Sequence, residues 1–198
     1  MLTYFSNKFT LRRDMFMRDQ KLKFLVVDAL FAVIIALLAQ VAIPLGPIPL
    51  TGQTFAIGLA ATILGARHGT ISVLVYIVLG AVGIPVFQGM TAGIGILFGP
   101  TGGFIVGFIF NALLTGWLLE KTKFTVPYAI VANILGAIVT LIFGVLWLKV
   151  STGLDWPAAF LTGMVPFIIP GIIKAVFAAL LGILIRDRLI KAKLLRAS

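Results

Sequence analysis

The chain has 198 residues, of which 61% are hydrophobic and only 11% charged, and its mean hydropathy is +1.16. Soluble domains are about 45–50% apolar and about 25% charged, so this composition excludes a water-soluble globule and favours a single membrane domain. The chain contains no cysteine, which excludes disulfides, Cys-ligated zinc, iron–sulfur clusters and thiol nucleophiles. The formal charge is +10, from 16 Lys and Arg against 6 Asp and Glu.

Six apolar segments lie between the charge clusters and the Pro/Gly clusters, and each predicts a membrane helix. Their ranges are about 24–43, 54–64, 69–82, 103–119, 128–148 and 163–185. The second and third are short and are separated by only four residues, 65–68, which is typical of a tight helical hairpin with a charged tip. We therefore predict an all-α integral membrane protein, a bundle of six transmembrane helices that occupies residues 24–186.

The basic residues gather where six spans would place them on one side of the membrane. Six precede residue 24, Arg67 lies between the second and third segments, Lys121 and Lys123 follow the fourth, and five come after residue 185. The positive-inside rule makes this side cytoplasmic. We therefore expect a multi-pass protein of the cell membrane with both termini in the cytoplasm.

The two ends of the chain, 1–23 and 187–198, are expected to be basic cytoplasmic tails. Phe, Met and Leu mix with the cations of the N-terminal tail, which favours a segment lying on the anionic lipids of the inner leaflet. A secretory signal is disfavoured, because the apolar run that follows is as long as a spanning helix and no small-residue cleavage site appears. The cations already have a topological explanation, so no nucleic-acid partner is expected.

Two loops on the outer side are rich in proline and glycine. The loop at 43–54 contains three prolines and is stiff, because proline fixes φ and removes a backbone donor. The loop at 84–103 is too apolar to lie in water and too rich in glycine for a good helix, so we expect it to fold back over the outer mouth of the bundle. Its glycines would let the backbone approach a ligand, or they make tight turns and close helix contacts; both interpretations stay open.

A lysine, Lys174, lies inside the sixth apolar segment. A lysine in a transmembrane helix costs about 2.5–3.5 kcal/mol on insertion scales and needs an acceptor or water, so it indicates function. Pro166 and Pro170 predict that the unbroken helix starts near Pro170, which places Lys174 one turn in, where the helix dipole favours negative charge. We expect a pocket for a carboxylate or a polarised carbonyl. The alternatives are that Lys174 reaches the outer interface or pairs with Asp155.

Other polar groups at membrane depth are few. The amides of Gln40, Asn111 and Asn133 are expected to join helices rather than contact a ligand, and His68 is expected to be solvated at its turn. No Walker motif, HExxH, nucleophile elbow or pair of carboxylates at membrane depth is present, so an enzyme is disfavoured and no cofactor or metal is expected. A channel is also disfavoured, because no span carries a continuous polar stripe.

Four alanines recur along one side of the first segment, at spacings of three, four and three: Ala29, Ala32, Ala36 and Ala39. Ala32 and Ala36 form a small-xxx-small pair, which lets another helix approach closely. From the spacing alone, packing within the bundle is the favoured interpretation.

Four stretches of the sequence form a recognisable set: IPLGPIPLTGQT at 43–54, GIPVF at 83–87, GPTGGF at 99–104 and PFIIPGIIK at 166–174. In this order they resemble the biotin-specific substrate-binding (S) components of energy-coupling-factor transporters, the BioY family, over about residues 24–188. The resemblance implies six helices, an outward-facing vitamin pocket, and uptake of biotin with a transmembrane coupling subunit and two ATPase subunits. The alternatives are another small anionic vitamin, a stand-alone facilitator, or an assembly subunit without a ligand.

Together with the loops, the resemblance implies two sets of site residues. The ligand-binding set is Thr51, Gln53, Phe87, Gln88, Gly89, Gly93, Gly99, Thr101, Gly102, Gly103, Gly171 and Lys174. The partner-docking set is Ala29, Ala32 and Ala36.

The chain departs from the family pattern at three positions. The family usually has Asp at the position of Gly171, Tyr at that of Phe104 and a larger apolar residue at that of Gly52. The absence of the Asp removes an acceptor for a ureido N–H and a counter-ion for Lys174. It thereby leaves Lys174 free for the carboxylate of a ligand.

Overall fold

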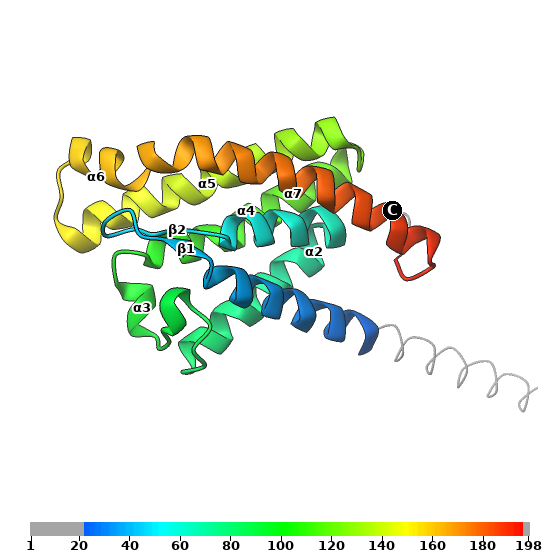
Figure 1. The fold of residues 1–198 in the computed structure, drawn as a ribbon, viewed down its shortest axis with the longest axis horizontal. Coiled ribbons are helices and arrows are strands. Elements are labelled where there is room, and N and C mark those ends of the chain that lie inside the picture. The colour runs from blue at the N-terminus through cyan, green and yellow to red at the C-terminus, as the bar shows by residue number, and fades with distance from the viewer. Residues whose placement is uncertain (1–21, 196–198) are drawn as a thin grey trace, which may run out of the picture.

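The computed structural model describes residues 22–195, and apart from one short strand pair its elements are helices (Figure 1). They are a first helix at Leu22–Ala39, β1 at Ala42–Ile43, β2 at Leu50–Thr51, α2 at Gln53–Ala81, the 3₁₀ turn η1 at Gln88–Met90, α3 at Gly95–Phe98, α4 at Gly102–Lys121, α5 at Val126–Thr152, α6 at Trp156–Gly163 and α7 at Val165–Lys191. Within the described residues, five helical stretches are long and apolar enough to cross a membrane, with α6 and α7 counted together. This confirms the prediction of an all-α membrane protein. Most of the predicted N-terminal tail, 1–21, lies outside the described residues.

The helix α2 is broken at Gly65, where φ is +82°. Glycine adopts this left-handed conformation without steric cost, whereas other residues rarely do. The two arms fold back on each other: a Cβ built on Gly69 would lie 2.8 Å from the Cα of Ala61, and the side chains of Gln53 and Tyr76 are hydrogen-bonded at 2.6 Å. The predicted tight hairpin between the second and third segments is therefore present.

Two charged side chains close the break at Gly65. A carboxylate oxygen of Glu120 accepts a hydrogen bond from the backbone N–H of Ala66 at 2.8 Å, and the guanidinium of Arg186 donates to the carbonyl of Ile63. An anion thus lies at the start of the second arm and a cation at the end of the first, as the helix dipoles favour. Arg186, the first of the five cations that follow the sixth apolar segment, is only 4% exposed and so lies inside the bundle.

Buried amides join the helices as expected at two of three positions. The Nδ2 of Asn133 donates to the Oγ1 of Thr62 at 2.8 Å, and the Nδ2 of Asn111 donates to the Oγ1 of Thr140 at 3.0 Å. These bonds tie α5 to α2 and to α4. Gln40 differs from the expectation, because it bonds a loop rather than a helix of the bundle.

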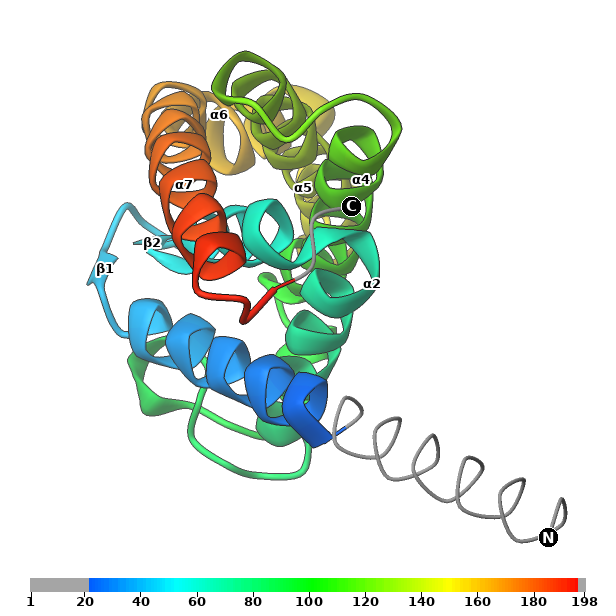
Figure 2. The same cartoon turned by 90° about the vertical axis from the view of Figure 1, so that its right-hand side faces the viewer.

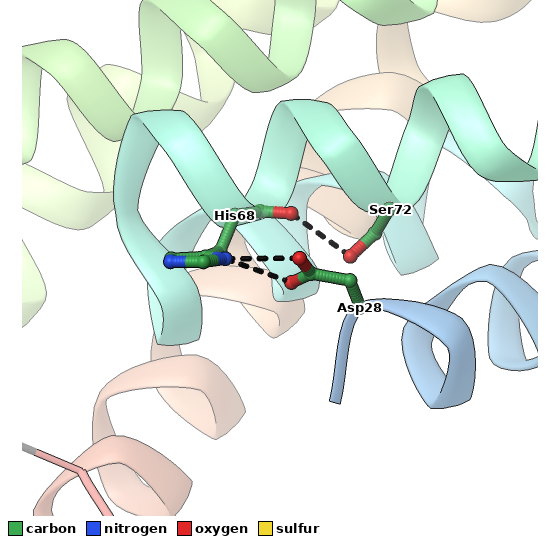
Figure 3. A network of polar contacts seen from close by, with 3 residues as sticks. All are labelled: Asp28, His68 and Ser72. Atoms are coloured by element: carbon green, nitrogen blue, oxygen red, sulfur yellow. Dashed lines mark hydrogen bonds and ion pairs between the residues drawn. The ribbon is translucent and has the colours of Figure 1, made fainter. Parts of the chain in front are cut away.

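His68 is not solvated, which corrects the sequence-based expectation. Its Nδ1 lies 2.9 Å from a carboxylate oxygen of Asp28, and Figure 3 shows this pair beside the bond from the Ser72 hydroxyl to the His68 carbonyl. The ring of Phe24 stacks on the imidazole, with 4.1 Å between ring centroids. The first helix brings Asp28 against His68 from 40 residues away in the sequence, and Phe24 from slightly further, which no local pattern indicates.

The main core lies between the first helix, α2 and α4, with large buried side chains such as Ile35, Ile57 and Tyr76. The end-on view in Figure 2 places the first helix on the opposite side of the bundle from α5 and α6. Between the first helix and α2, the strands β1 and β2 pair antiparallel, with Ala42 opposite Thr51. This strand pair brings the loop at 43–50 against the end of α7 that carries Lys174.

Candidate ligand pocket

A cavity of about 220 Å³ lies where β2 and the loop before it meet residues 87–101, α4, α5 and α7. Its wall is formed by Ile48, Pro49, Leu50, Thr51, Gln53, Thr54, Phe87, Gln88, Thr91, Ile96, Thr101, Phe104, Ile105, Phe108, Ala137, Leu141, Phe167, Gly171 and Lys174. Most of these side chains are apolar, and the polar ones are few, as is typical of small-molecule sites.

Lys174 projects from α7 into this wall. Its ammonium donates a hydrogen bond to the backbone carbonyl of Thr51 at 3.0 Å, which joins α7 to β2. The helix starts at Val165, with Pro166 in its first turn and Pro170 inside it. The prediction of a start near Pro170 is therefore wrong: the helix continues past a proline, which costs it one backbone hydrogen bond there. Lys174 consequently lies deeper in α7 than one turn.

The charge of Lys174 has no acid beside it in the wall of the cavity. Among the described residues that line the cavity, none is Asp or Glu. Asp155, the alternative partner, instead caps α6 by accepting a hydrogen bond from the N–H of Ala158 at 2.9 Å. An ammonium group has three donors, and the bond to Thr51 uses one. The cavity therefore suits a guest that carries one negative charge.

A chain of hydrogen bonds fixes the polar edge next to Lys174. The hydroxyl of Thr51 donates to the side-chain oxygen of Gln53 at 2.7 Å, and the Nε2 of Gln53 donates to the hydroxyl of Tyr76 at 2.6 Å. The Thr51 carbonyl that holds Lys174 belongs to the same residue. The two arms of α2 and the β2 strand thus orient the cation together.

Aromatic rings form much of the apolar wall. The rings of Phe104 and Phe167 lie 6.3 Å apart, and Phe87 packs edge-to-face on Tyr76 at 5.6 Å. Phe104 and Phe108 follow one another by one helical turn on α4 and both line the cavity. These two and Phe167 are absent from the predicted site, because an aromatic residue in an apolar span usually belongs to the core. The one available signal is their position at the quoted motifs: Phe104 directly follows the Gly-Pro-Thr-Gly-Gly stretch, Phe108 is one helical turn further, and Phe167 lies in the stretch at 166–174.

Seven of the twelve predicted ligand-binding residues line the cavity: Thr51, Gln53, Phe87, Gln88, Thr101, Gly171 and Lys174. The lining also includes Thr54 and Thr91, which the prediction missed. The Oγ1 of Thr54 is buried and has no hydrogen-bond partner among residues 22–195.

The other five predicted residues are glycines outside the lining. Gly89 and Gly93 have positive φ, at +70° and +104°, and make turns. The carbonyl of Gly99 accepts a hydrogen bond from the indole of Trp147 at 3.0 Å. A Cβ on Gly102 or Gly103 would overlap a neighbour, so these two allow close packing at the start of α4. Direct contact of the five with a ligand stays a prediction.

The three predicted docking alanines differ in exposure. Ala29 is exposed and Ala36 is half-buried, whereas Ala32 is only 1% exposed. Ala32 therefore packs against the core of this chain, as the packing interpretation expects. In this structure only Ala29 and Ala36 are accessible to a partner.

The fold and the cavity define a small helical membrane protein with a cavity, lined by Lys174 and aromatic rings, that is suited to an organic anion. The BioY family model matches residues 11–191, and this chain belongs to the BioY family. The match begins 13 residues before the region on which the resemblance was recognised, so it includes part of the N-terminal tail.

Curated relatives share most of their length with this chain. The "Biotin transporter BioY2" of Lactococcus lactis subsp. cremoris (strain MG1363) is 45% identical over 167 residues, 84% of this chain and 92% of the relative. The "Biotin transporter BioY" of Rhizobium etli is 41% identical, with 80% and 90% covered, and that of Thermotoga maritima is 38% identical, with 80% and 93% covered.

A solved structure has the same fold. The crystal structure of the S-component for biotin from an ECF-type ABC transporter superposes with a TM-score of 0.80. It is 29% identical in sequence, and the match covers 85% of this chain and 93% of that chain.

Proposed function

We propose that this chain is the biotin-binding S component of an energy-coupling-factor transporter, which captures biotin at the outer face and delivers it inward. The observation that carries the proposal is the ammonium of Lys174, which faces a cavity without an acid in its described wall. Membership of the BioY family and the similarity to biotin transporters support biotin as the guest. No catalytic step is involved, since the family is one of transporter subunits.

The cavity offers each part of biotin a matching surface. The carboxylate would take the two donors of Lys174 that the Thr51 carbonyl does not use. The hydrocarbon chain and the fused rings would pack on the aromatic wall of Phe87, Phe104 and Phe167. Neutral hydroxyls and amides, such as those of Thr54 and Gln88, would form hydrogen bonds with the ureido group.

Titration of the purified protein with biotin tests this proposal. We expect saturable binding, and Lys174→Ala should weaken it at least tenfold, about 1.4 kcal/mol. Lys149→Ala is the matched control, because Lys149 lies over the ring of Trp156 at 5.0 Å and does not line the cavity. Biotin amide, which lacks the negative charge, should bind the wild type about as weakly as biotin binds Lys174→Ala. If the intact protein binds no biotin, the proposal fails.

The topology that we propose has six spans with both termini in the cytoplasm. The two arms of α2, 53–64 and 66–81, would be short spans of about 18 and 24 Å at about 1.5 Å per residue. The placement of the cations supports this orientation, with Lys123 inside and Ser151 outside. Because the chain lacks cysteine, a single cysteine substitution introduces its only thiol, and labelling of that thiol reports the side of the membrane on which it lies. A membrane-impermeant maleimide applied to whole cells should label Ser151→Cys and not Lys123→Cys; the reverse pattern would invert the topology.

The proposed partners are a transmembrane coupling subunit, met through the exposed side of the first helix, and two ATPase subunits. The absence of a Walker motif in this chain supports an external source of energy. Biotin uptake by cells that lack the ATPase subunits separates the alternatives: uptake that persists would identify a stand-alone facilitator. Competition by other anionic vitamins would reveal a different cargo.

A further inference from the structure

Gln40 follows directly on the first helix and bonds a segment almost 50 residues away. Its Nε2 lies within hydrogen-bond distance of the carbonyls of Val86 and Phe87, at 3.3 and 3.0 Å, and of Ala36 in its own helix, at 3.1 Å. Its Oε1 accepts a hydrogen bond from the N–H of Met90 at 2.9 Å. Both ends of the amide are therefore used, and both bond the same short segment.

That segment, residues 86–91, which we call the lid turn, forms one edge of the cavity. Phe87, Gln88 and Thr91 line the cavity wall. The N–H of Phe87 donates to the carbonyl of Thr91 at 3.0 Å, which closes the turn on itself. The side chain of Phe87 is 1% exposed and its ring packs on Tyr76. The position of this turn consequently determines how the cavity is covered.

The lid turn has a backbone that its own sequence does not favour. Gly89 and Met90 both have positive φ, at +70° and +57°. Glycine adopts this region freely, but for Met it is unfavourable because Cβ crowds the backbone. The N–H of this strained Met90 is the group that Gln40 holds. A contact from outside the turn therefore stabilises a conformation that the turn adopts at a cost.

We propose that Gln40 is a positioning residue that holds the lid turn over the cavity and thereby slows the release of the ligand. Gln40 does not line the cavity and acts only through the lid turn. The inference rests on the proposed function, because it needs a ligand whose release can be followed. Only a side chain with both a donor and an acceptor can make these bonds, which is why the amide matters.

The test is the dissociation rate of radiolabelled biotin from the purified full-length protein in lipid nanodiscs. Gln40→Leu removes all bonds to the lid turn and should raise the rate about tenfold or more. Gln40→Glu keeps the acceptor for the Met90 N–H but places a negative charge against two lid carbonyls, so it should raise the rate as well. Gln40→Glu conserves the shape of the side chain and serves if Gln40→Leu does not fold.

A matched control separates positioning from general loosening of the bundle. Asn133→Leu removes a buried amide that joins α5 to α2 away from the cavity. It should lower the thermal unfolding temperature and leave the dissociation rate unchanged within about twofold. An equal rise in the rates of Asn133→Leu and Gln40→Leu would overturn the inference.

A second substitution in the lid turn tests the role of strain. Met90→Gly relieves the positive φ, so in the Gln40→Leu background it should lower the dissociation rate again, whereas in the wild type it should change little. Met90 is exposed and outside the cavity wall, so the substitution leaves the ligand contacts intact. If the wild type binds biotin and Gln40→Leu releases it at the wild-type rate, the inference is wrong while the proposed function stands. If the wild type binds no biotin, the proposed function fails first.

Discussion

Two buried or half-buried cations on α7, Lys174 and Arg186, make the same kind of bond at opposite ends of the bundle. Each donates to a backbone carbonyl 123 residues earlier in the sequence, Lys174 to Thr51 and Arg186 to Ile63. Their surroundings differ. Lys174 faces a cavity whose described lining contains no Asp or Glu. Arg186 lies over the ring of Phe124, and Glu120 and Asp187 attract its charge.

The difference shows what decides the use of a cation inside a membrane protein. At the end of the bundle near the break at Gly65, Glu120 and Asp187 border a cavity of about 360 Å³ together with Arg186 and Lys123, so acids and cations are equal in number there. At the end that carries Lys174, no Asp or Glu lies in the described lining of the cavity, and the proposed function assigns the charge of Lys174 to the ligand. The same type of hydrogen bond therefore stabilises the fold where acids are near, and under the proposed function it leaves donors for a ligand where acids are absent.

The largest expected effect on stability comes from removing the buried side chain of Arg186. Arg186→Ala removes a buried guanidinium that donates to the Ile63 carbonyl and lies over the ring of Phe124, and a hydrogen bond to a charged group contributes about 1.5–3 kcal/mol. We expect a large fall in the thermal unfolding temperature in detergent. Lys174→Ala should lower that temperature less, since it loses one hydrogen bond, to the Thr51 carbonyl, and also removes a charge that no acid in the described lining of the cavity balances. Arg188→Ala, an exposed arginine in the last turn of α7, is the matched control. Comparable unfolding temperatures for Arg186→Ala and Arg188→Ala would contradict the comparison.

A smaller effect should come from the glycines next to the two cations. Gly65→Ala places a residue with a Cβ at a φ of +82°, which costs at least about 1–2 kcal/mol. The added Cβ would also overlap the carboxylate of Glu120. Gly171→Ala adds a Cβ where no atom lies within 4 Å, in a helical residue, and should leave stability unchanged or slightly raised. Denaturation curves of the two variants against the wild type measure this difference. Equal losses in both would show that the break at Gly65 is not locked as described.

The surroundings of Lys174 could be predicted from the sequence better than those of Arg186, for a physical reason. Lys174 is conspicuous because a charge in an apolar helix is costly, and Thr51 and Gln53 lie in a loop whose prolines limit its shape. The sequence groups Arg186 only with the cations that follow the sixth apolar segment, because a charge near the end of an apolar run resembles a flanking residue. Its burial depends on the helix break at Gly65, which lies more than 100 residues away.

Contacts between distant segments account for the other differences. His68 meets Asp28, and Gln40 meets Met90, only after the helices have packed. Phe104 and Phe108 look like core residues in the sequence, and they line a wall because the outer loops leave space beside them. Pro170 lies inside α7 because a single missing hydrogen bond does not end a helix that packs well on its neighbours.

The smallest expected effect concerns the pair of His68 and Asp28, which ties the first helix to α2 away from the cavity. Asp28→Asn keeps the shape of the side chain and removes its charge, so it should cost about 0.5–1.5 kcal/mol of stability, the net value of one hydrogen bond. Because neither residue lines the cavity, the affinity and the dissociation rate of biotin should stay at their wild-type values. Gln40→Glu, the opposite change near the other end of the same helix, should alter the dissociation rate. If Asp28→Asn speeds biotin release as much as Gln40→Glu does, the first helix acts as one unit, and the separation of a structural inner end from a binding outer end is wrong.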